Sequence, residues 1–267
     1  MPTRSFTLIA HRGYSSDAPE NTYEAFDLAI EHGFANIELD VQLTSDGVPV
    51  IIHDDTLDRT TNGAGPVAKA SIAKMKSVDA GLWFEGPGDS VGRIGVAAYG
   101  DAFVPTLDEV LERYLGRVHF HMELKSGEPE LPPKVAAALR AFGWVNAAGA
   151  FALEHARGAS VPGLTISSFR FEQLERSLPL LPHIPHGWLL ERITPESIVE
   201  AKNAGLSGIY PRASMVTATI VRLATGAGLS IRTWGVRDEA DLRRAYDSGA
   251  VGTTVDWPGR ARKIIKL

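Results

Sequence analysis

Hydrophobic and polar residues alternate with a period of two in VHFHMELK, residues 118–125, where apolar side chains are interleaved with ionisable ones. Successive side chains of a strand point to opposite faces, so the pattern predicts a strand with one apolar and one polar face. Taken alone, it fits an edge strand with its charges in water and equally a strand whose polar face enters an active site. The place of this strand in the whole fold decides between them.

The rest of the chain alternates short β-rich runs with helical stretches. Besides 118–124, the pattern predicts strands over residues 6–10, 36–41, 164–168, 187–190, 208–210, 230–234 and 251–255, with a short extra strand over 48–52. It predicts helices over residues 19–33, 106–115, 133–142, 171–177, 195–204, 216–225, 239–248 and 259–265. Without 48–52 there are eight strand–helix units, which predicts an α/β fold, a (β/α)₈ TIM barrel forming a single domain over residues 1–267.

Two segments lack such periodicity. Residues 54–105 are rich in Gly, Asp and Thr, and we interpret them as a small insertion after the second strand. Their apolar run at Leu82, Trp83 and Phe84 is either the insertion's own small core or an exposed patch that contacts lipid. Residues 146–163, rich in Ala and Gly, allow no assignment.

The composition excludes several classes of function. The 267 residues include 44% hydrophobic ones and carry a net charge of −5 with both signs mixed along the chain, so nucleic acid is not an expected partner. The absence of cysteine excludes disulfides, thiolate zinc sites and cysteine nucleophiles. The apolar run at residues 6–10 is too short for a signal-peptide core or a membrane span, which predicts a soluble, cytoplasmic protein without a membrane anchor.

Ionisable residues stand at many of the predicted strand ends. In a (β/α)₈ barrel these ends converge in space, and active sites lie there. The residues concerned are His11, Arg12, Glu38, Asp40, His53, Glu123, Lys125 and Asp256. A solvated face explains so many charged strand ends poorly, so we expect an active site at the carboxyl end of the barrel.

Three of these residues are carboxylates that could hold one hard cation. Glu38 and Asp40 are two apart and share a face of their strand, and Glu123 ends the strand over residues 118–124. Oxygen ligands suit Mg²⁺ or Ca²⁺, whereas zinc favours nitrogen and sulfur. The competing interpretation is a structural ion-pair network.

The remaining polar residues suit phosphoryl chemistry. A dication beside Arg12 and Lys125 makes a positive pocket for a phosphoryl group, whose oxygens gain negative charge during displacement. His11 and His53 are then candidate proton carriers, one accepting a proton from the attacking oxygen and the other donating one to the leaving oxygen. Arg12 and Lys125 could instead only neutralise the carboxylates.

The same residues fall in motifs that resemble the glycerophosphodiester phosphodiesterase family. The motifs are HRGYSSDAPENTYEAF at 11–26, IELDVQLTSDGVPVIIHDDTLDRTTNG at 37–63, PTLDEVL at 105–111, MELK at 122–125, ISSF at 166–169 and VDWP at 255–258. They keep the family's order over nearly the whole chain. The resemblance implies a (β/α)₈ barrel with a small insertion after the second strand. It also implies hydrolysis of glycerophosphodiesters to glycerol 3-phosphate and an alcohol with one divalent cation, Mg²⁺ or Ca²⁺.

The resemblance also implies a role for each matching residue. It gives His11 and His53 as the catalytic pair, Glu38, Asp40 and Glu123 as metal ligands, Arg12 and Lys125 as phosphate contacts, and Phe169 and Trp234 as aromatic residues lining the substrate pocket. The two aromatic residues could alternatively serve packing alone. Departures from the family pattern at Arg237 and Val255 bear on substrate preference more than on chemistry.

Several alternatives stay open. Lysophospholipids could be cleaved at the same site, as by a lysophospholipase D, or the protein could bind phosphorylated ligands without catalysis. His119 and His121 form a His-x-His pair like the metal ligands of amidohydrolases, but we interpret His121 as supporting the site and His119 as lying deeper. Asp256 either positions Lys125 or anchors the barrel. The sequence does not predict the oligomeric state.

Overall fold

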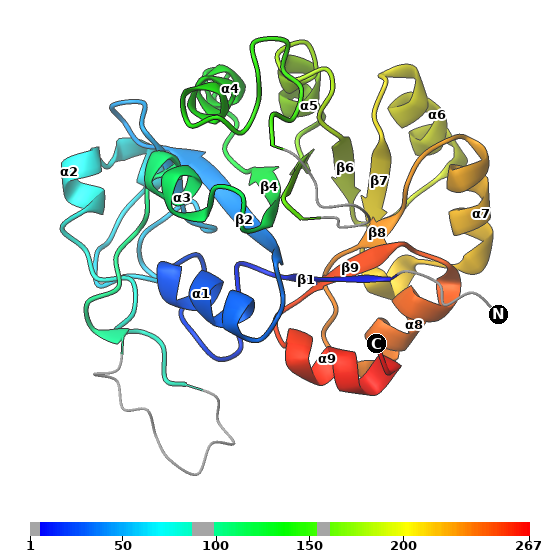
Figure 1. Cartoon of the computed structure of the whole chain (residues 1–267), viewed down its shortest axis with the longest axis horizontal. Coiled ribbons are helices and arrows are strands. Elements are labelled where there is room, and N and C mark those ends of the chain that lie inside the picture. The colour runs from blue at the N-terminus through cyan, green and yellow to red at the C-terminus, as the bar shows by residue number, and fades with distance from the viewer. Residues whose placement is uncertain (1–5, 87–98, 154–160) are drawn as a thin grey trace.

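The computed structural model describes residues 6–86, 99–153 and 161–267. Among these residues, eight parallel strands form a barrel with helices outside it (Figure 1). The strands are β1 (Thr7–Ala10), β2 (Asn36–Leu43), β4 (His119–Leu124), β5 (Gly163–Ser168), β6 (His186–Leu190), β7 (Gly208–Pro211), β8 (Arg232–Thr233) and β9 (Gly252–Val255). They pair in the order β7-β6-β5-β4-β2-β1-β9-β8, and parallel bridges Gly208–Ser230 and Arg212–Trp234 join β7 to β8. The predicted fold is confirmed, with strand bounds shifted by one or two residues.

Helices follow the strands in the predicted order, although α1 begins four residues later than predicted. They are α1 (Tyr23–Glu31), α3 (Leu107–Tyr114), α4 (Leu131–Ala141), α5 (Phe171–Ser177), α6 (Pro195–Asn203), α7 (Ala218–Gly226), α8 (Glu239–Ser248) and α9 (Pro258–Ile265). Thr22 and Thr106 cap their helices by accepting hydrogen bonds from backbone N–H groups, and Thr106 completes a capping box with Glu109. Helix α4 begins two residues earlier than predicted, because prolines are tolerated in the first turn of a helix.

The segment between β2 and α3 holds the predicted insertion. Strand β3 (Pro49–Ile51) pairs antiparallel with β2, and α2 (Ile72–Met75) follows. A separate hydrophobic cluster forms here from Val50, Ile52, Leu57, Val67, Ala70, Met75, Val78, Ala80 and Val104. In the run at 82–84, Leu82 is exposed and Phe84 is buried, so neither interpretation holds for the whole run. Residues 87–98, and 154–160 in the unassigned segment 146–163, lie outside the described residues, and the single-domain organisation stays a prediction.

The main hydrophobic core lies between the barrel wall and the helices. Phe120 of β4 contacts Phe26 of α1, Tyr114 of α3 and Trp144, at ring-centroid distances of 6.1, 5.9 and 5.5 Å. These rings are fully buried. The apolar face of the alternating strand therefore points outward to the helices, and its polar face points into the barrel. This placement favours the active-site interpretation over the exposed edge strand.

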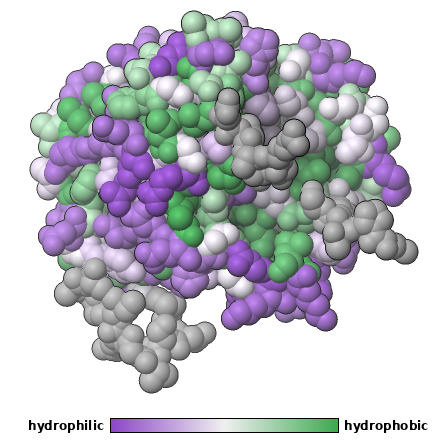
Figure 2. Space-filling view, in the orientation of Figure 1, coloured by the Kyte–Doolittle hydropathy of each residue, from purple (hydrophilic) through white to green (hydrophobic). Residues whose placement is uncertain are grey.

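The surface carries the charged residues that the core excludes. Hydrophilic residues gather over α9 at the lower edge of the face in Figure 2. Within the described part of the chain, every helix is too short or too polar to cross a membrane. The cytoplasmic location stays a prediction.

Candidate active site

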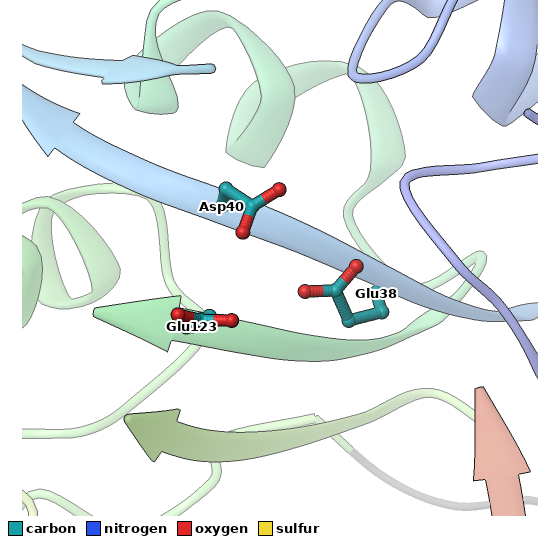
Figure 3. Close-up of side chains that lie close together, drawn as sticks. All are labelled: Glu38, Asp40 and Glu123. Atoms are coloured by element: carbon teal, nitrogen blue, oxygen red, sulfur yellow. The ribbon is translucent and has the colours of Figure 1, made fainter. Parts of the chain in front are cut away.

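Glu38, Asp40 and Glu123 lie together on two neighbouring strands (Figure 3). Glu38 and Asp40 share a face of β2, and the parallel register pairs Asp40 with Glu123 of β4. One carboxylate oxygen from each residue lies within 4.8 Å of the others, and all three side chains are buried. Oxygen atoms this close in a buried site are a suitable ligand set for one hard divalent cation.

The cluster is only partly neutralised by protein cations. Arg12 Nε lies 3.3 Å from Asp40 Oδ2, and Lys125 Nζ lies 3.1 Å from Glu123 Oε1. Burial raises the pKa of Glu38 to about 7, with help from the nearby Asp40 charge. Burial also acts to raise the pKa of Asp40, but Arg12 and Lys125 outweigh it and hold that pKa well below its usual range. Buried Asp40 Oδ1 has no hydrogen-bond partner among the described residues, so the site fits a cation that this oxygen would ligate.

The loop after β1 is shaped to reach the carboxylates. Arg12 and Asn21 both adopt left-handed backbone conformations, with φ of 56° and 59°. Residues other than glycine rarely take this conformation. This conformation lets the Arg12 backbone N–H donate to Glu38 Oε2 at 3.0 Å, while the Asn21 amide donates to Asp40 Oδ2 at 2.9 Å. A Cβ at Gly13 would come within 2.6 Å of the Ala25 Cβ, so glycine allows the loop to pack on α1.

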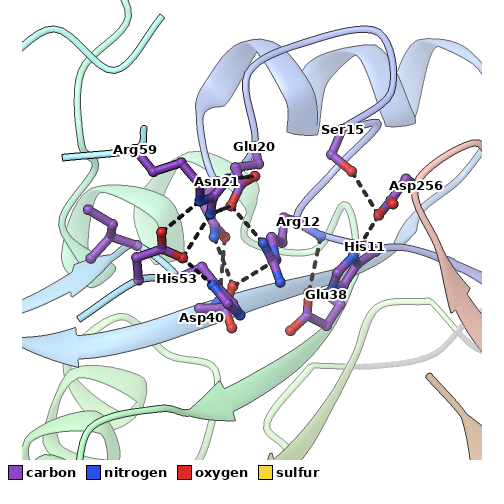
Figure 4. A network of polar contacts seen from close by, with 12 residues as sticks. His11, Arg12, Ser15, Glu20, Asn21, Glu38, Asp40, His53, Arg59 and Asp256 are labelled. Atoms are coloured by element: carbon purple, nitrogen blue, oxygen red, sulfur yellow. Dashed lines mark hydrogen bonds and ion pairs between the residues drawn. The ribbon is translucent and has the colours of Figure 1, made fainter. Parts of the chain in front are cut away.

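His11 and His53 are each oriented by a carboxylate that bonds the Nδ1 atom of the ring. His11 Nδ1 bonds Asp256 Oδ1 at 2.6 Å, and His53 Nδ1 bonds Asp54 Oδ1 at 2.6 Å (Figure 4). These bonds occupy Nδ1 of each histidine and leave Nε2 as the other ring nitrogen; His11 Nε2 lies 3.9 Å from Glu38 Oε2. The described contacts of the Asp256 side chain are with His11 and Ser15 rather than with Lys125, because the turn after β1 brings His11 next to the end of β9.

The two imidazoles have opposite pKa shifts. Burial and Arg12 act to lower the pKa of His11, but the hydrogen bond to Asp256 and the Glu38 charge raise it overall. Burial lowers the pKa of His53, and the positive charge of Arg12 adds to that effect. The protein therefore holds its two histidines in different electrostatic environments within one site.

A second network links His53 to Arg12 (Figure 4). Arg59 donates to Asp54 Oδ2 at 2.6 Å and to both carboxylate oxygens of Glu20 at 2.8 Å. Glu20 in turn accepts from Arg12 Nη1 at 2.7 Å. Sequence reasoning missed Arg59 and Glu20, and also Asn21. All of them stand inside the two long motifs, but which groups pair cannot be read from a linear pattern.

A cavity of about 150 Å³ connects these groups. The predicted residues that line it are His11, Arg12, Glu38, His53, Glu123, Lys125, Phe169 and Trp234; Ser167, Leu189, Arg232, Gly235 and Thr254 also line it, without having been predicted. Phe169 and Trp234 meet edge to face with ring centroids 4.8 Å apart. A wider groove between α5 and α6 holds none of the predicted site residues, so the smaller cavity is the candidate active site.

His119 and His121 lie deeper in the barrel, stacked with ring centroids 4.3 Å apart. His119 Nε2 bonds the Thr165 hydroxyl at 2.8 Å, and His121 Nε2 bonds Asn36 Oδ1 at 3.3 Å. Burial lowers the pKa of His121 well below its usual value. Within the described residues the acidic triad is the group that could hold a metal, and neither histidine belongs to it, so the His-x-His ligand pair is not favoured.

Comparisons with known proteins identify the family of the chain. The sequence profile of the Glycerophosphoryl diester phosphodiesterase family matches residues 11–260. A glycerophosphodiester phosphodiesterase of Bacillus subtilis is 32% identical, over 99% of this chain and 88% of its own length. An Oleispira antarctica phosphodiesterase, solved in complex with the product sn-glycerol-3-phosphate, is 28% identical with a TM-score of 0.82, covering 98% of both chains. An Agrobacterium tumefaciens glycerophosphodiester phosphodiesterase is 31% identical with a TM-score of 0.72, covering 95% of this chain and 97% of its own. The chain belongs to the glycerophosphoryl diester phosphodiesterase family, whose enzymes are phosphoric diester hydrolases.

Proposed function

We propose that the protein hydrolyses glycerophosphodiesters to sn-glycerol 3-phosphate and an alcohol, with a divalent cation and two histidine proton carriers. The observation that carries this is a shared place at the carboxyl end of the barrel for the two histidines and the buried acidic triad (Glu38, Asp40 and Glu123). His11, His53, Glu38 and Glu123 line one cavity there, and Asp40 lies beside the other two carboxylates. Family membership supports the reaction. The complex of the Oleispira antarctica relative with sn-glycerol-3-phosphate supports the product.

In this proposal the histidines carry protons at Nε2. Asp256 and Asp54 hold the Nδ1 atoms of His11 and His53, so each ring presents its other nitrogen to the substrate. One Nε2 accepts the proton of the oxygen that attacks phosphorus. The other donates a proton to the alcohol oxygen as its bond to phosphorus breaks.

Arg12 and Lys125 bind the phosphoryl oxygens in this proposal. Both line the cavity beside the acidic triad, and both are fixed by ion pairs to Asp40. The triad would hold Mg²⁺ or Ca²⁺, which when bound supplies positive charge to the phosphoryl oxygens. Fixed cations favour the displacement because negative charge grows on these oxygens.

Phe169 and Trp234 contact the carbon skeleton of the substrate in this proposal. Trp234 is held by hydrogen bonds from Nε1 to the Leu190 and Tyr210 carbonyls, both at 3.1 Å. Phe169 lies against its ring and is partly exposed at the mouth of the cavity. Such an apolar wall beside a polar site suits the C–H groups of a glycerol unit.

A direct assay tests the function. Purified protein is incubated with glycerophosphocholine and either Mg²⁺ or Ca²⁺, and release of sn-glycerol 3-phosphate is measured. We expect product with at least one of the two metals and none after chelation. A panel with ethanolamine, serine and glycerol headgroups extends the assay, and absence of product from every diester would contradict the proposal.

Lysophospholipids as substrates and binding without catalysis stay predictions. The first was motivated by the apolar run at 82–84, where Leu82 is exposed but Phe84 is buried against Trp83 and Tyr99. A protein that binds phosphorylated ligands without catalysis would be expected to lack a histidine or a carboxylate of the site. This chain has both histidines and all three carboxylates. No further contact of the described residues favours either of them.

Arg59 is a positioning residue in this proposal, because it touches neither histidine but fixes Asp54 and Glu20. We expect Arg59→Ala to lower kcat by about 10- to 100-fold through misplacement of His53, with a smaller change in KM. Its side chain is 44% exposed, so lost stability should stay below about 1 kcal/mol. Steady-state kinetics and thermal unfolding measure both.

The matched control for this variant is Arg113→Ala. Arg113 also forms a 2.6 Å ion pair and is 46% exposed, but neither it nor its partner Asp27 is among the residues that line the cavity. Arg113→Ala should keep wild-type kcat, and Arg59→Lys should recover part of the lost rate. Equal kcat in Arg59→Ala and wild type would show that the network does not position His53.

A further inference from the structure

Arg232 is a buried arginine that the proposed chemistry does not use. It stands on β8, two residues before Trp234, so both side chains point into the barrel and Arg232 lies further from the mouth. Its side chain lines the active-site cavity, yet the residue is only 5% exposed. A buried charge is strongly destabilising unless it is paired or bonded, so the partners of this guanidinium decide what it can do.

Arg232 differs from the other cations of the cavity in having no carboxylate partner. Arg12 pairs with Glu20 and Asp40, and Lys125 pairs with Asp40 and Glu123. Throughout the described residues, no carboxylate forms an ion pair with Arg232, and the hydrogen bond that the structure gives it runs from Nη2 to the Ser167 hydroxyl at 3.2 Å. Its Nε is buried and has no hydrogen-bond partner in the part of the chain that the structure describes. A guanidinium has five N–H donors, so most of this group's capacity is unused.

The barrel wall is shaped to support this guanidinium. The Arg232 group lies over the Tyr210 ring, 4.3 Å from its centroid. That ring occupies space left by two glycines, because a Cβ at Gly187 or Gly208 would overlap it at 1.9 and 2.6 Å. Arginine planes stack well on aromatic faces, which fixes their orientation for planar, two-point recognition of an anion.

We propose that Arg232 binds a second anionic group of the substrate, a carboxylate or a phosphate, in the deep part of the cavity. The inference rests on the proposed function, in which Arg12 and Lys125 bind the phosphoryl group nearer the mouth. A substrate anion would supply the counter-charge that the protein does not provide, and Ser167 would keep the guanidinium directed at it. Besides glycerophosphodiesters, the site would then accept, and bind more tightly, diesters whose three-carbon alcohol ends in an acidic group instead of a hydroxyl.

Direct binding of small product analogues tests this without turnover. Calorimetry with the Mg²⁺-loaded full chain compares sn-glycerol 3-phosphate with 3-phosphoglycerate, which differs by a carboxylate in place of a terminal hydroxymethyl group. Glycerol 1,3-bisphosphate tests a phosphate in the same place. We expect wild-type protein to bind at least one of the two anionic ligands at least about tenfold more tightly than sn-glycerol 3-phosphate, the gain of a charge-assisted hydrogen bond.

Arg232→Met should abolish this preference and keep the affinity for sn-glycerol 3-phosphate within about threefold. Ser167→Ala, which keeps the charge, should reduce the preference to a few-fold and serves if the first variant does not fold. Arg243→Gln, on the exposed face of α8, is the control and should match wild type. The proposal is overturned if wild type has no preference for either anion, or if Arg232→Met weakens all ligands equally, as a structural role would. If only the diester assay failed, the proposed function would be contradicted. The binding preference for an anionic ligand would still be decided by the calorimetry.

Discussion

Replacing His11 or His53 with alanine should lower kcat on glycerophosphocholine by roughly 10²–10⁴-fold, the usual loss when a general acid or base is removed. Each ring is fixed by a carboxylate at Nδ1 and lines the cavity, so alanine removes a proton carrier without removing an apolar contact of the core. KM should change much less than kcat, because neither histidine is a phosphate contact in the proposal.

A change of leaving group separates the roles of the two histidines. A diester whose leaving group is p-nitrophenolate needs no proton on the departing oxygen, so the variant that lacks the proton donor should lose far less rate on it. The variant that lacks the acceptor should lose the same factor on both substrates. His183→Ala, which changes an exposed histidine, should keep the wild-type rate on both.

The pH profile provides a second readout. The wild-type rate should rise and then fall with pH, because one histidine must be neutral and the other protonated. The opposite pKa shifts of His11 and His53 separate the two limbs of this profile. Each alanine variant should lose one limb. Wild-type rates in either variant would show that the corresponding imidazole moves no proton in the rate-limiting step.

The fold could be predicted because each level of the sequence points to the same structure. A barrel is specified by the alternation in residues 118–124, by helix caps such as Thr106 and by the repeated strand–helix order. The helices pack on the apolar side of each strand. The barrel in turn explains why strand-end residues as far apart as His11 and Glu123 line one cavity. Local pattern and fold-level rules were therefore sufficient to predict that these strand-end residues lie together.

What could not be predicted depends on side-chain geometry. Asp256 reaches His11 only because β9 neighbours β1, and Arg59 bridges two carboxylates from a loop without periodicity. Arg232 lies in the strand predicted over residues 230–234. Its lack of an ion-pair partner among the described residues is visible only in three dimensions. Pairing of charges is a property of distances, which the order of residues along a chain does not give.

Removal of the metal is the second change with a large expected effect. We expect chelation to abolish turnover. Glu123→Gln should weaken the binding of Mg²⁺ or Ca²⁺ by at least roughly 10- to 100-fold, the loss that is usual when a residue that merely hydrogen-bonds a metal ligand is removed. Glu123 shares the site with Glu38 and Asp40, and the amide keeps its shape but removes its charge. Calorimetric titration with the metal measures the affinity, and Glu172→Gln, an exposed carboxylate on α5, should bind as wild type does.

Metal affinity should rise with pH. Burial and the Asp40 charge raise the pKa of Glu38 to about 7, so near pH 5 this carboxyl carries a proton that the metal must displace. Near pH 8 it is already ionised, and binding no longer releases that proton. The increase in melting temperature on adding metal should therefore be larger at pH 8 than at pH 5. An increase that does not depend on pH would argue against Glu38 as a ligand.

The metal-free stability of Glu123→Gln distinguishes a ligand from a structural ion pair. If Glu123 served mainly as the partner of Lys125, 3.1 Å away, its loss would leave a buried ammonium with less counter-charge and destabilise the protein. If Glu123 is instead a metal ligand, its charge is unfavourable without the metal. Burial and the Asp40 charge raise the pKa of Glu123, so its ionised form is disfavoured until a cation binds. Lys125 also keeps Asp40 as a partner at 3.7 Å. We therefore expect Glu123→Gln to melt at or above the wild-type temperature without metal, and to gain little stability when Mg²⁺ or Ca²⁺ is added.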